Sequence, residues 1–245
     1  MSLTLNDDSL PWLKYTAETD GLPTIPGGWS QKQFMVGPRQ LRLTLPAVPD
    51  AFLEDPQVLA ENRIDDYMPY WAYLWPISLK MADFFYRRMS QPDKLRLPDP
   101  VIEFGCGVGA VGLGLLVAGC EVIFSDYRDE PVQVALYNAH ANGFSSCRGL
   151  VHDWRNPPPF RCASLVACEV LYEQRNHQPI LEFLSAIMTD DGICWIGDPG
   201  RGKSISFLSL ARGRKFEVEI LDERGETQPT FRHGAFQLLK ITKNV

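Results

Sequence analysis

The sequence predicts an α/β fold with a mostly parallel sheet and helices on both faces. From about residue 101 onward, short apolar strand patterns alternate with helical patterns, which is the order that builds a parallel sheet. The first of these strands runs straight into a glycine-rich turn, and the second ends in an acidic residue. A turn and an acid in these positions are typical of folds that bind a nucleoside.

The turn has the residues that a closely approaching ligand needs. The first strand, 101–104, carries Glu103 near its end, and three glycines follow at alternate positions, Gly105, Gly107 and Gly109. Glycine adopts positive φ easily and places no Cβ between the backbone and a ligand. Asp126 follows the second strand, 121–125, where a carboxylate can accept hydrogen bonds from both hydroxyls of a ribose. Together these residues predict a nucleoside-cofactor site.

The chain divides into two parts in this interpretation. Residues 1–65 are rich in proline and glycine, and their one alternating segment, 40–45, predicts a short strand or hairpin within an irregular N-terminal cap. Residues 66–245 are expected to form the cofactor-binding domain. Its first helix should run from about residue 78 to 89, before the glycine turn.

The elements after the turn follow in order. Further strands are expected over 148–151, 163–168 and 193–197, and helices from about 109 and over 130–142, 176–189 and 204–213. Two closing strands, 216–221 and 235–242, are joined by a polar loop without a helix. Such a connection predicts that the last strand is antiparallel. We therefore expect seven strands, all but the last parallel.

Composition and charge restrict the class of partner. With 245 residues, 45% of them hydrophobic, and a net charge of −6, the chain lacks the positive field of a nucleic-acid-binding protein. It has neither a signal peptide nor an apolar run of the roughly 18 residues that a membrane span needs, so we expect a cytoplasmic protein without a membrane partner. The six cysteines show no CxxC pairing, so neither a metal site nor disulfides are expected. The oligomeric state is not indicated.

Several motifs resemble one enzyme family. The run from Glu103 to Gly109 resembles the first cofactor motif of the class I S-adenosylmethionine-dependent methyltransferases, and Pro69–Pro76 resembles the segment before it in the family 16 protein-lysine methyltransferases. Residues 196–201 resemble a sequence in the branch that acts on the electron transfer flavoprotein β-subunit. The resemblance covers about residues 65–242. It implies a Rossmann-like fold, S-adenosyl-L-methionine as cofactor, and a lysine of a protein substrate as acceptor.

The resemblance also implies the site residues. Asp153 and Trp154 resemble the pair that frames adenine, and residues 166–173 resemble the fourth-strand motif, with Glu169 where aspartate is usual. The implied cofactor contacts are Trp75, Glu103, Gly105, Cys106, Gly107, Gly109, Asp126, Tyr127, Asp153, Trp154 and Cys168. We hypothesise that Tyr172 and Glu173 orient the acceptor nitrogen. Helix capping is the alternative role for Glu173.

Other functions stay open from the sequence. A class I methyltransferase that acts on a small-molecule amine or another metabolite is the main alternative. The spacing of Gly107, Gly109 and Gly112 also satisfies the dinucleotide pattern of an NAD-dependent oxidoreductase. Residues 197–204 satisfy the P-loop pattern of nucleotide-binding proteins. Only about 40 residues follow that loop, too few for the other parts of a P-loop domain.

Overall fold

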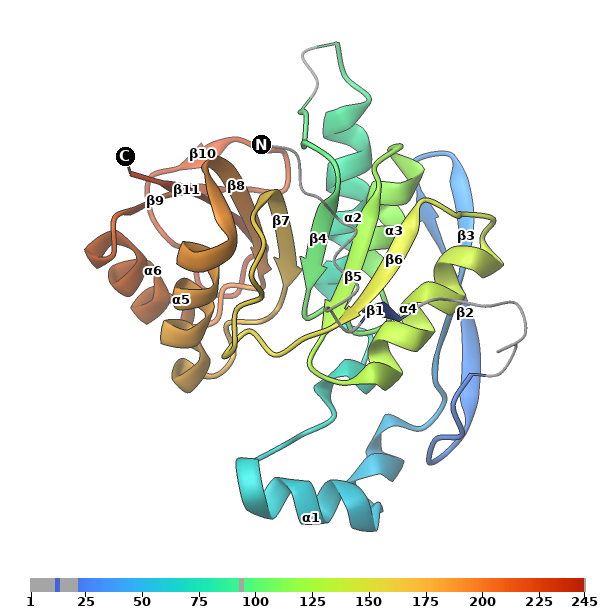
Figure 1. Cartoon of the computed structure of the whole chain (residues 1–245). Helices are drawn as coiled ribbons and strands as arrows, with labels where there is room; N and C mark the ends of the chain where they lie inside the picture. Colours follow the sequence, from blue (N-terminus) through green and yellow to red (C-terminus); the bar gives the residue numbers. More distant parts are fainter. Residues whose placement is uncertain (1–11, 14–21, 93–94, 245) are drawn as a thin grey trace.

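A central sheet organises the protein in this computed structural model, which describes residues 12–13, 22–92 and 95–244 (Figure 1). Within these ranges the sheet has nine strands. Their spatial order is β1 (Trp12–Leu13), β6 (Cys147–Val151), β5 (Val122–Asp126), β4 (Val101–Phe104), β7 (Cys162–Cys168), β8 (Met188–Asp198), β11 (Gln237–Lys243), β9 (Phe216–Leu221) and β10 (Thr227–Gln228). From β6 to β8 all neighbouring strands are parallel.

The expected mostly parallel sheet is confirmed, but the expected count of seven strands was wrong. β1 and β10 are two-residue strands that pair antiparallel at the two edges of the sheet. Two residues are too few to leave an alternating pattern in the sequence. The last strand, β11, is antiparallel as expected, and it lies between β8 and β9.

Helices cover both faces of the sheet, as the alternating strand residues require. Helices α2 (Pro76–Met89), α3 (Ala110–Val117) and α4 (Asp129–Ala141) share one apolar cluster with Val101 and Phe124. Helices α5 (His177–Ile187) and α6 (Ser204–Gly213) share another with Phe104 and Leu165. Successive strand side chains point to opposite faces, and β4, β7, β8 and β11 accordingly contribute residues to both clusters.

No helix connects β6 to β7, so other residues cover that part of the sheet. Ile102, Ile123, Leu150 and Cys162 form a separate small cluster, against which Trp12 and Phe160 pack. Trp12 belongs to the two-residue strand β1. Trp12 of β1 therefore packs on a part of the sheet that no crossover helix covers.

The segment before α2 contains a hairpin and short helices. The strand expected at 40–45 lies in β3 (Arg39–Pro46), which pairs with β2 (Trp29–Val36). The 3₁₀ helix η2 (Pro49–Glu54), α1 (Pro56–Asp65) and the 3₁₀ helix η3 (Tyr70–Ala72) follow. In Figure 1, α1 lies at the bottom, on the side of the carboxyl ends of the parallel strands. The division of the chain at residue 65 stays a prediction.

Asn138 fastens this hairpin to the sheet domain. Its wholly buried amide accepts a hydrogen bond from the Thr44 N–H at 2.7 Å and donates to the Thr44 carbonyl at 2.9 Å and the Val108 carbonyl at 3.0 Å. One side chain on α4 therefore holds β3 and the glycine turn together.

Among the described helices, none combines the length and the apolar character that crossing a membrane requires. The expected cytoplasmic location stays a prediction.

Candidate active site

A cavity of about 280 Å³ opens at the carboxyl ends of the parallel strands. Of the predicted site residues, all but Gly109 line it: Trp75, Glu103, Gly105, Cys106, Gly107, Asp126, Tyr127, Asp153, Trp154, Cys168, Tyr172 and Glu173. They come from five separate segments of the chain. The carboxyl edge of a parallel sheet is where open α/β folds bind their ligands.

Gly109 lies beside the cavity and has a structural task. It precedes α3 with φ at +79°, and a Cβ there would come within 2.8 Å of the Ala135 Cβ on α4. Gly107, in contrast, does line the cavity at φ +51°. In the glycine turn, Gly107 therefore faces the cavity, whereas Gly109 allows α3 and α4 to pack closely.

Asp126 joins the glycine turn to the end of the second core strand. Its Oδ2 accepts a hydrogen bond from the Gly107 N–H at 2.9 Å, and its Oδ1 accepts one from the Tyr127 N–H at 2.8 Å. Desolvation raises the pKa of this carboxyl to about 6 despite these hydrogen bonds. Each carboxylate oxygen has a second lone pair, so Asp126 can still accept from a ligand's hydroxyls.

Glu103 is the more deeply buried acid below the cavity. Its side chain is 2% exposed and accepts a hydrogen bond from the Gly112 N–H of α3 at 2.8 Å. Burial raises the pKa of Glu103 to about 8. Burial therefore favours the protonated form of this carboxyl.

The two cysteines of the cavity carry inert thiols. Burial raises the pKa of Cys106 and of Cys168 well above the usual value, and neighbouring carboxylates act in the same direction. Since the thiolate is the reactive form of cysteine, neither residue is suited to act as a nucleophile.

Aromatic side chains form one wall of the cavity. The Trp75 indole N–H donates to the Tyr70 carbonyl at 3.1 Å, and the rings of Tyr70 and Tyr172 meet edge to face with centroids 4.9 Å apart. Burial raises the pKa of Tyr172, so its hydroxyl stays protonated and can donate a hydrogen bond. Sequence reasoning did not single out Tyr70, because one aromatic among several in residues 67–75 has no distinct signal.

Glu173 stands at the N-cap position of the 3₁₀ helix η4 (Gln174–Asn176), but its side chain makes no capping hydrogen bond. Instead, its Oε2 accepts a hydrogen bond from Arg175 Nε at 2.6 Å. Glu173 therefore lies at the cavity as an ion-paired carboxylate.

Glu169 is held by an arginine that the sequence did not assign to the site. Glu169 is 5% exposed, adopts φ +56°, and pairs through Oε2 with Arg201 Nη2 at 2.5 Å. The Arg201 guanidinium also lies 5.5 Å from the centre of the Trp75 ring. Glu169 and Arg201 therefore form a partly buried ion pair beside Trp75.

Neither a family model nor a curated protein matches the sequence. Several solved structures are similar to this chain in fold. A TehB-like SAM-dependent methyltransferase from Corynebacterium glutamicum is similar with a TM-score of 0.54 at 17% identity, over 80% of this chain and 100% of that chain. The CcbJ methyltransferase from Streptomyces caelestis is similar with a TM-score of 0.55 at 12% identity, over 75% and 96%. The glycopeptide N-methyltransferase MtfA, solved with sinefungin, has a TM-score of 0.54 at 10% identity, over 68% and 94%.

This chain has the class I methyltransferase fold. The sheet does not fit the alternative of a dinucleotide-binding fold. In a dinucleotide-binding Rossmann fold the sixth strand lies parallel beside the fifth. Here antiparallel β11 lies between β8 and β9 instead. At these levels of identity the likeness extends to the fold alone, and it supports neither a lysine acceptor nor the flavoprotein branch.

The contacts within residues 197–204 do not fit the alternative of a phosphate-binding P-loop. Asp198, which is wholly buried, accepts hydrogen bonds from the N–H groups of Gly200 at 2.7 Å and Arg201 at 2.9 Å. Its other oxygen accepts from the Ser204 hydroxyl at 2.6 Å. A phosphate-binding loop needs such donors for its ligand, and here a carboxylate of the chain occupies them.

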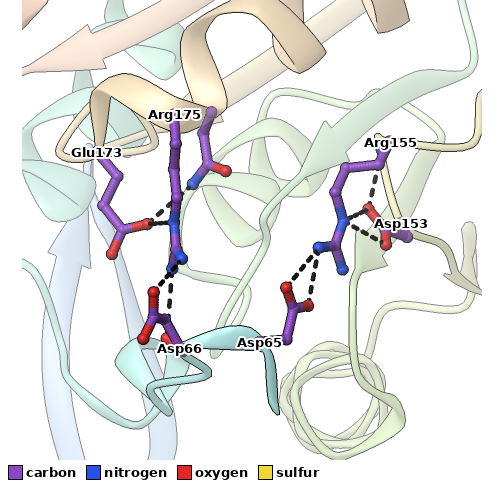
Figure 2. Close-up of polar contacts among 7 residues, drawn as sticks. Asp65, Asp66, Asp153, Arg155, Glu173 and Arg175 are labelled. Atoms are coloured by element: carbon purple, nitrogen blue, oxygen red, sulfur yellow. Dashed lines mark hydrogen bonds and ion pairs between the residues drawn. The ribbon is translucent and has the colours of Figure 1, made fainter. Parts of the chain in front are cut away.

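Ionic side chains near the cavity mouth are the largest group that sequence reasoning missed. Figure 2 shows Arg155 between Asp153 and Asp65, and Arg175 between Glu173 and Asp66. Arginines in loops carry no signal that tells a site from a solvated surface. In the described part of the chain, no group of three or more histidine, cysteine or acidic residues is placed to hold a metal ion.

Proposed function

We propose that this protein is an S-adenosylmethionine-dependent methyltransferase that methylates a lysine side chain of a protein. The observation that carries the proposal is the meeting of the glycine turn and Asp126 in one cavity, at the carboxyl edge of a sheet with the methyltransferase strand order. The motif resemblance to the family 16 enzymes supports lysine as acceptor.

The residues present fit an adenosyl cofactor. Asp126 would accept from the ribose hydroxyls, and Trp154 and Asp153 would border the adenine. Gly107, where a Cβ would meet no atom closer than 3.5 Å, would leave room beside its backbone for the part of the cofactor beyond the adenosine. Burial raises the pKa of Glu103 and of Asp126. A positively charged ligand in the cavity would lower both pKa values, since a cation favours the ionised carboxylate.

The cofactor would supply a methyl group on a sulfonium that carries its own leaving group. The protein's part is then to bring an unprotonated amine in line with the methyl group and to exclude water. A lysine amine has a pKa of roughly 10.4 in water, and the aromatic wall of Tyr70, Trp75 and Tyr172 would favour its neutral form by desolvation. Tyr172 and Glu173 would orient the nitrogen by hydrogen bonds.

A small-molecule amine is the second candidate acceptor. The observation that favours it is the position of residues 65–68, which line the cavity together with the aromatic wall. A segment from before the sheet domain therefore borders the cavity, and it could close over a small acceptor.

Calorimetric titration with S-adenosylhomocysteine, NADH and ATP tests the cofactor. We expect binding of S-adenosylhomocysteine alone. Binding of NADH or ATP alone would contradict the proposal. Incubation of the protein with labelled S-adenosylmethionine and host lysate, with the Asp126→Ala variant as control, then tests the acceptor. Label on lysines of a protein band supports the proposal, and label confined to small molecules favours the second candidate.

Tyr172 and Glu173 give a test of the acceptor side. We expect Tyr172→Phe and Glu173→Ala each to lower kcat by about tenfold or more, because each removes a hydrogen bond to the reacting amine, with little change in S-adenosylhomocysteine affinity. Single-turnover kinetics with the acceptor found in lysate would measure this. Unchanged turnover in both variants would remove these residues from the mechanism.

A further inference from the structure

Three arginines at the carboxyl edge of the sheet hold one face of α1. Arg128 follows β5, Arg155 follows β6, and Arg175 lies in η4 after β7. Their partners on α1 and its C-cap are all acidic: Arg128 Nη1 pairs with Glu61 at 3.1 Å, Arg155 Nη1 with Asp65 at 2.8 Å, and Arg175 Nη1 with Asp66 at 2.9 Å. We call these six residues the α1 clasp.

The clasp lies at the mouth of the cavity. Five of its members line the cavity, namely Asp65, Asp66, Arg128, Arg155 and Arg175. The contacts join segments far apart in sequence, since Arg155 is 90 residues from Asp65 and Arg175 is 109 residues from Asp66. Figure 2 shows the two arginines extending from separate elements to the neighbouring aspartates. The end of α1 is thereby drawn against three loops that border the site.

Apolar packing contributes little to holding α1. Its one buried side chain is Val58, while Leu59 is 43% exposed and Ile64 is 85% exposed. Most helices in proteins are held by an apolar face. A helix with a single buried side chain depends on its polar contacts instead, here the clasp.

The clasp also reaches the site carboxylates. Arg155 Nε bonds Asp153 Oδ2 at 2.8 Å, and Arg175 Nε bonds Glu173 Oε2 at 2.6 Å. Each of these arginines therefore joins one carboxylate of the cavity to one of α1. The Arg155 arm lies on the side assigned to adenine, and the Arg175 arm lies on the side assigned to the acceptor.

We propose that the α1 clasp closes α1 over the bound cofactor, with Arg155 and Arg175 as positioning residues, and that the cofactor leaves only when these ion pairs open. This rests on the proposed function, which places S-adenosylmethionine in the cavity. The side chains of Asp66 and Arg175 are 81% and 48% exposed. Because exposed ion pairs are individually weak and are screened by salt, these contacts can open and re-form.

The test is the dissociation rate of labelled S-adenosylmethionine, chased with excess S-adenosylhomocysteine, for the unaltered protein and the Asp65→Asn/Asp66→Asn double variant. At low salt we expect release from the variant to be faster by about fivefold or more, because both arms lose their charge pairing. Salt near 1 M should accelerate release from the unaltered protein, and should change the variant less.

Two controls separate the clasp from general effects of charge. Asp65→Glu/Asp66→Glu keeps both charges and should retain slower release than the asparagine variant. Glu219→Gln removes a carboxylate that pairs with Lys240 at 2.8 Å between β9 and β11, outside the cavity, and should leave release unchanged. In the ligand-free protein, amide hydrogen exchange over residues 56–66 should rise in the asparagine variant and stay unchanged in Glu219→Gln.

The outcomes distinguish the two proposals. If the unaltered protein binds the labelled cofactor and the asparagine variant releases it at the same rate, the clasp does not control exchange and this inference is overturned while the proposed function stands. If the unaltered protein binds no S-adenosylmethionine, the proposed function fails, and the role of the clasp in cofactor release fails with it.

Discussion

Asp126 makes hydrogen bonds within the fold and is also the residue that we propose to bind the ribose. It fastens the glycine turn through the Gly107 N–H and keeps accepting capacity toward the cavity. Because desolvation raises its pKa to about 6, the carboxylate becomes protonated as the pH falls through 6 and then accepts hydrogen bonds less well.

We therefore expect the affinity for S-adenosylhomocysteine to decrease as the pH is lowered from 8 to 5. Asp126→Asn should bind at least about tenfold more weakly at pH 8, by loss of a charged acceptor, and should lose most of the pH dependence. Calorimetry across this range measures both effects. Equal affinity of the two proteins at pH 8 would show that Asp126 does not contact the ligand.

Glu103 gives a prediction about stability. Its pKa of about 8 lies above the usual value of 4.5, so between these two pH values the folded protein binds a proton that the unfolded chain has released. The free energy of unfolding therefore falls as the pH rises through this window. Glu103→Gln keeps an oxygen for the Gly112 N–H and removes the titration. We expect the variant to be more stable than the unaltered protein at pH 9, and denaturant titrations at pH 5 and pH 9 measure the difference.

At the scale of the element, α3 depends on a glycine that the cofactor motif alone does not explain. A Cβ on Gly112 would lie 2.3 Å from Phe124 Cε1 and 2.6 Å from Glu103 Oε2. The helix can therefore approach β4 and β5 only because this position has no side chain.

Gly112→Ala should lower the free energy of unfolding by about 3 kcal/mol, since the added methyl group overpacks a closed interface. Gly213→Ala, at the end of α6 where a Cβ meets no atom within 4 Å, is the matched control and should change it by less than about 1 kcal/mol. Urea denaturation of both variants measures this. A loss as large in Gly213→Ala would point to another cause.

At the scale of the whole molecule, the two-residue strand β1 extends the sheet at the edge formed by β6. Trp12 packs against the small third cluster of apolar residues, and β1 pairs with β6 at the sheet edge. The segment thus compensates for the missing helix between β6 and β7.

Trp12→Ala should therefore lower the free energy of unfolding by about 2 kcal/mol, from the apolar area that it exposes. Met35→Ala, at a side chain already 53% exposed, serves as control and should have little effect. Thermal unfolding compares the two. If both variants melt at the temperature of the unaltered protein, the N-terminal strand contributes no stability to the sheet.

The sequence by itself determined the alternation of strands and helices, the antiparallel last strand, the glycine turn and the position of Asp126. Each of these features has a local signal in the sequence, such as the period of the apolar residues, the spacing of the glycines or the lack of a helical pattern between two strands. Only the tertiary structure decided the edge strands, the pairing of Glu169 with Arg201, and the α1 clasp. Those depend on charged or short segments brought together across many residues, and neither an exposed arginine nor a two-residue strand shows in its own sequence which partner the fold will place beside it.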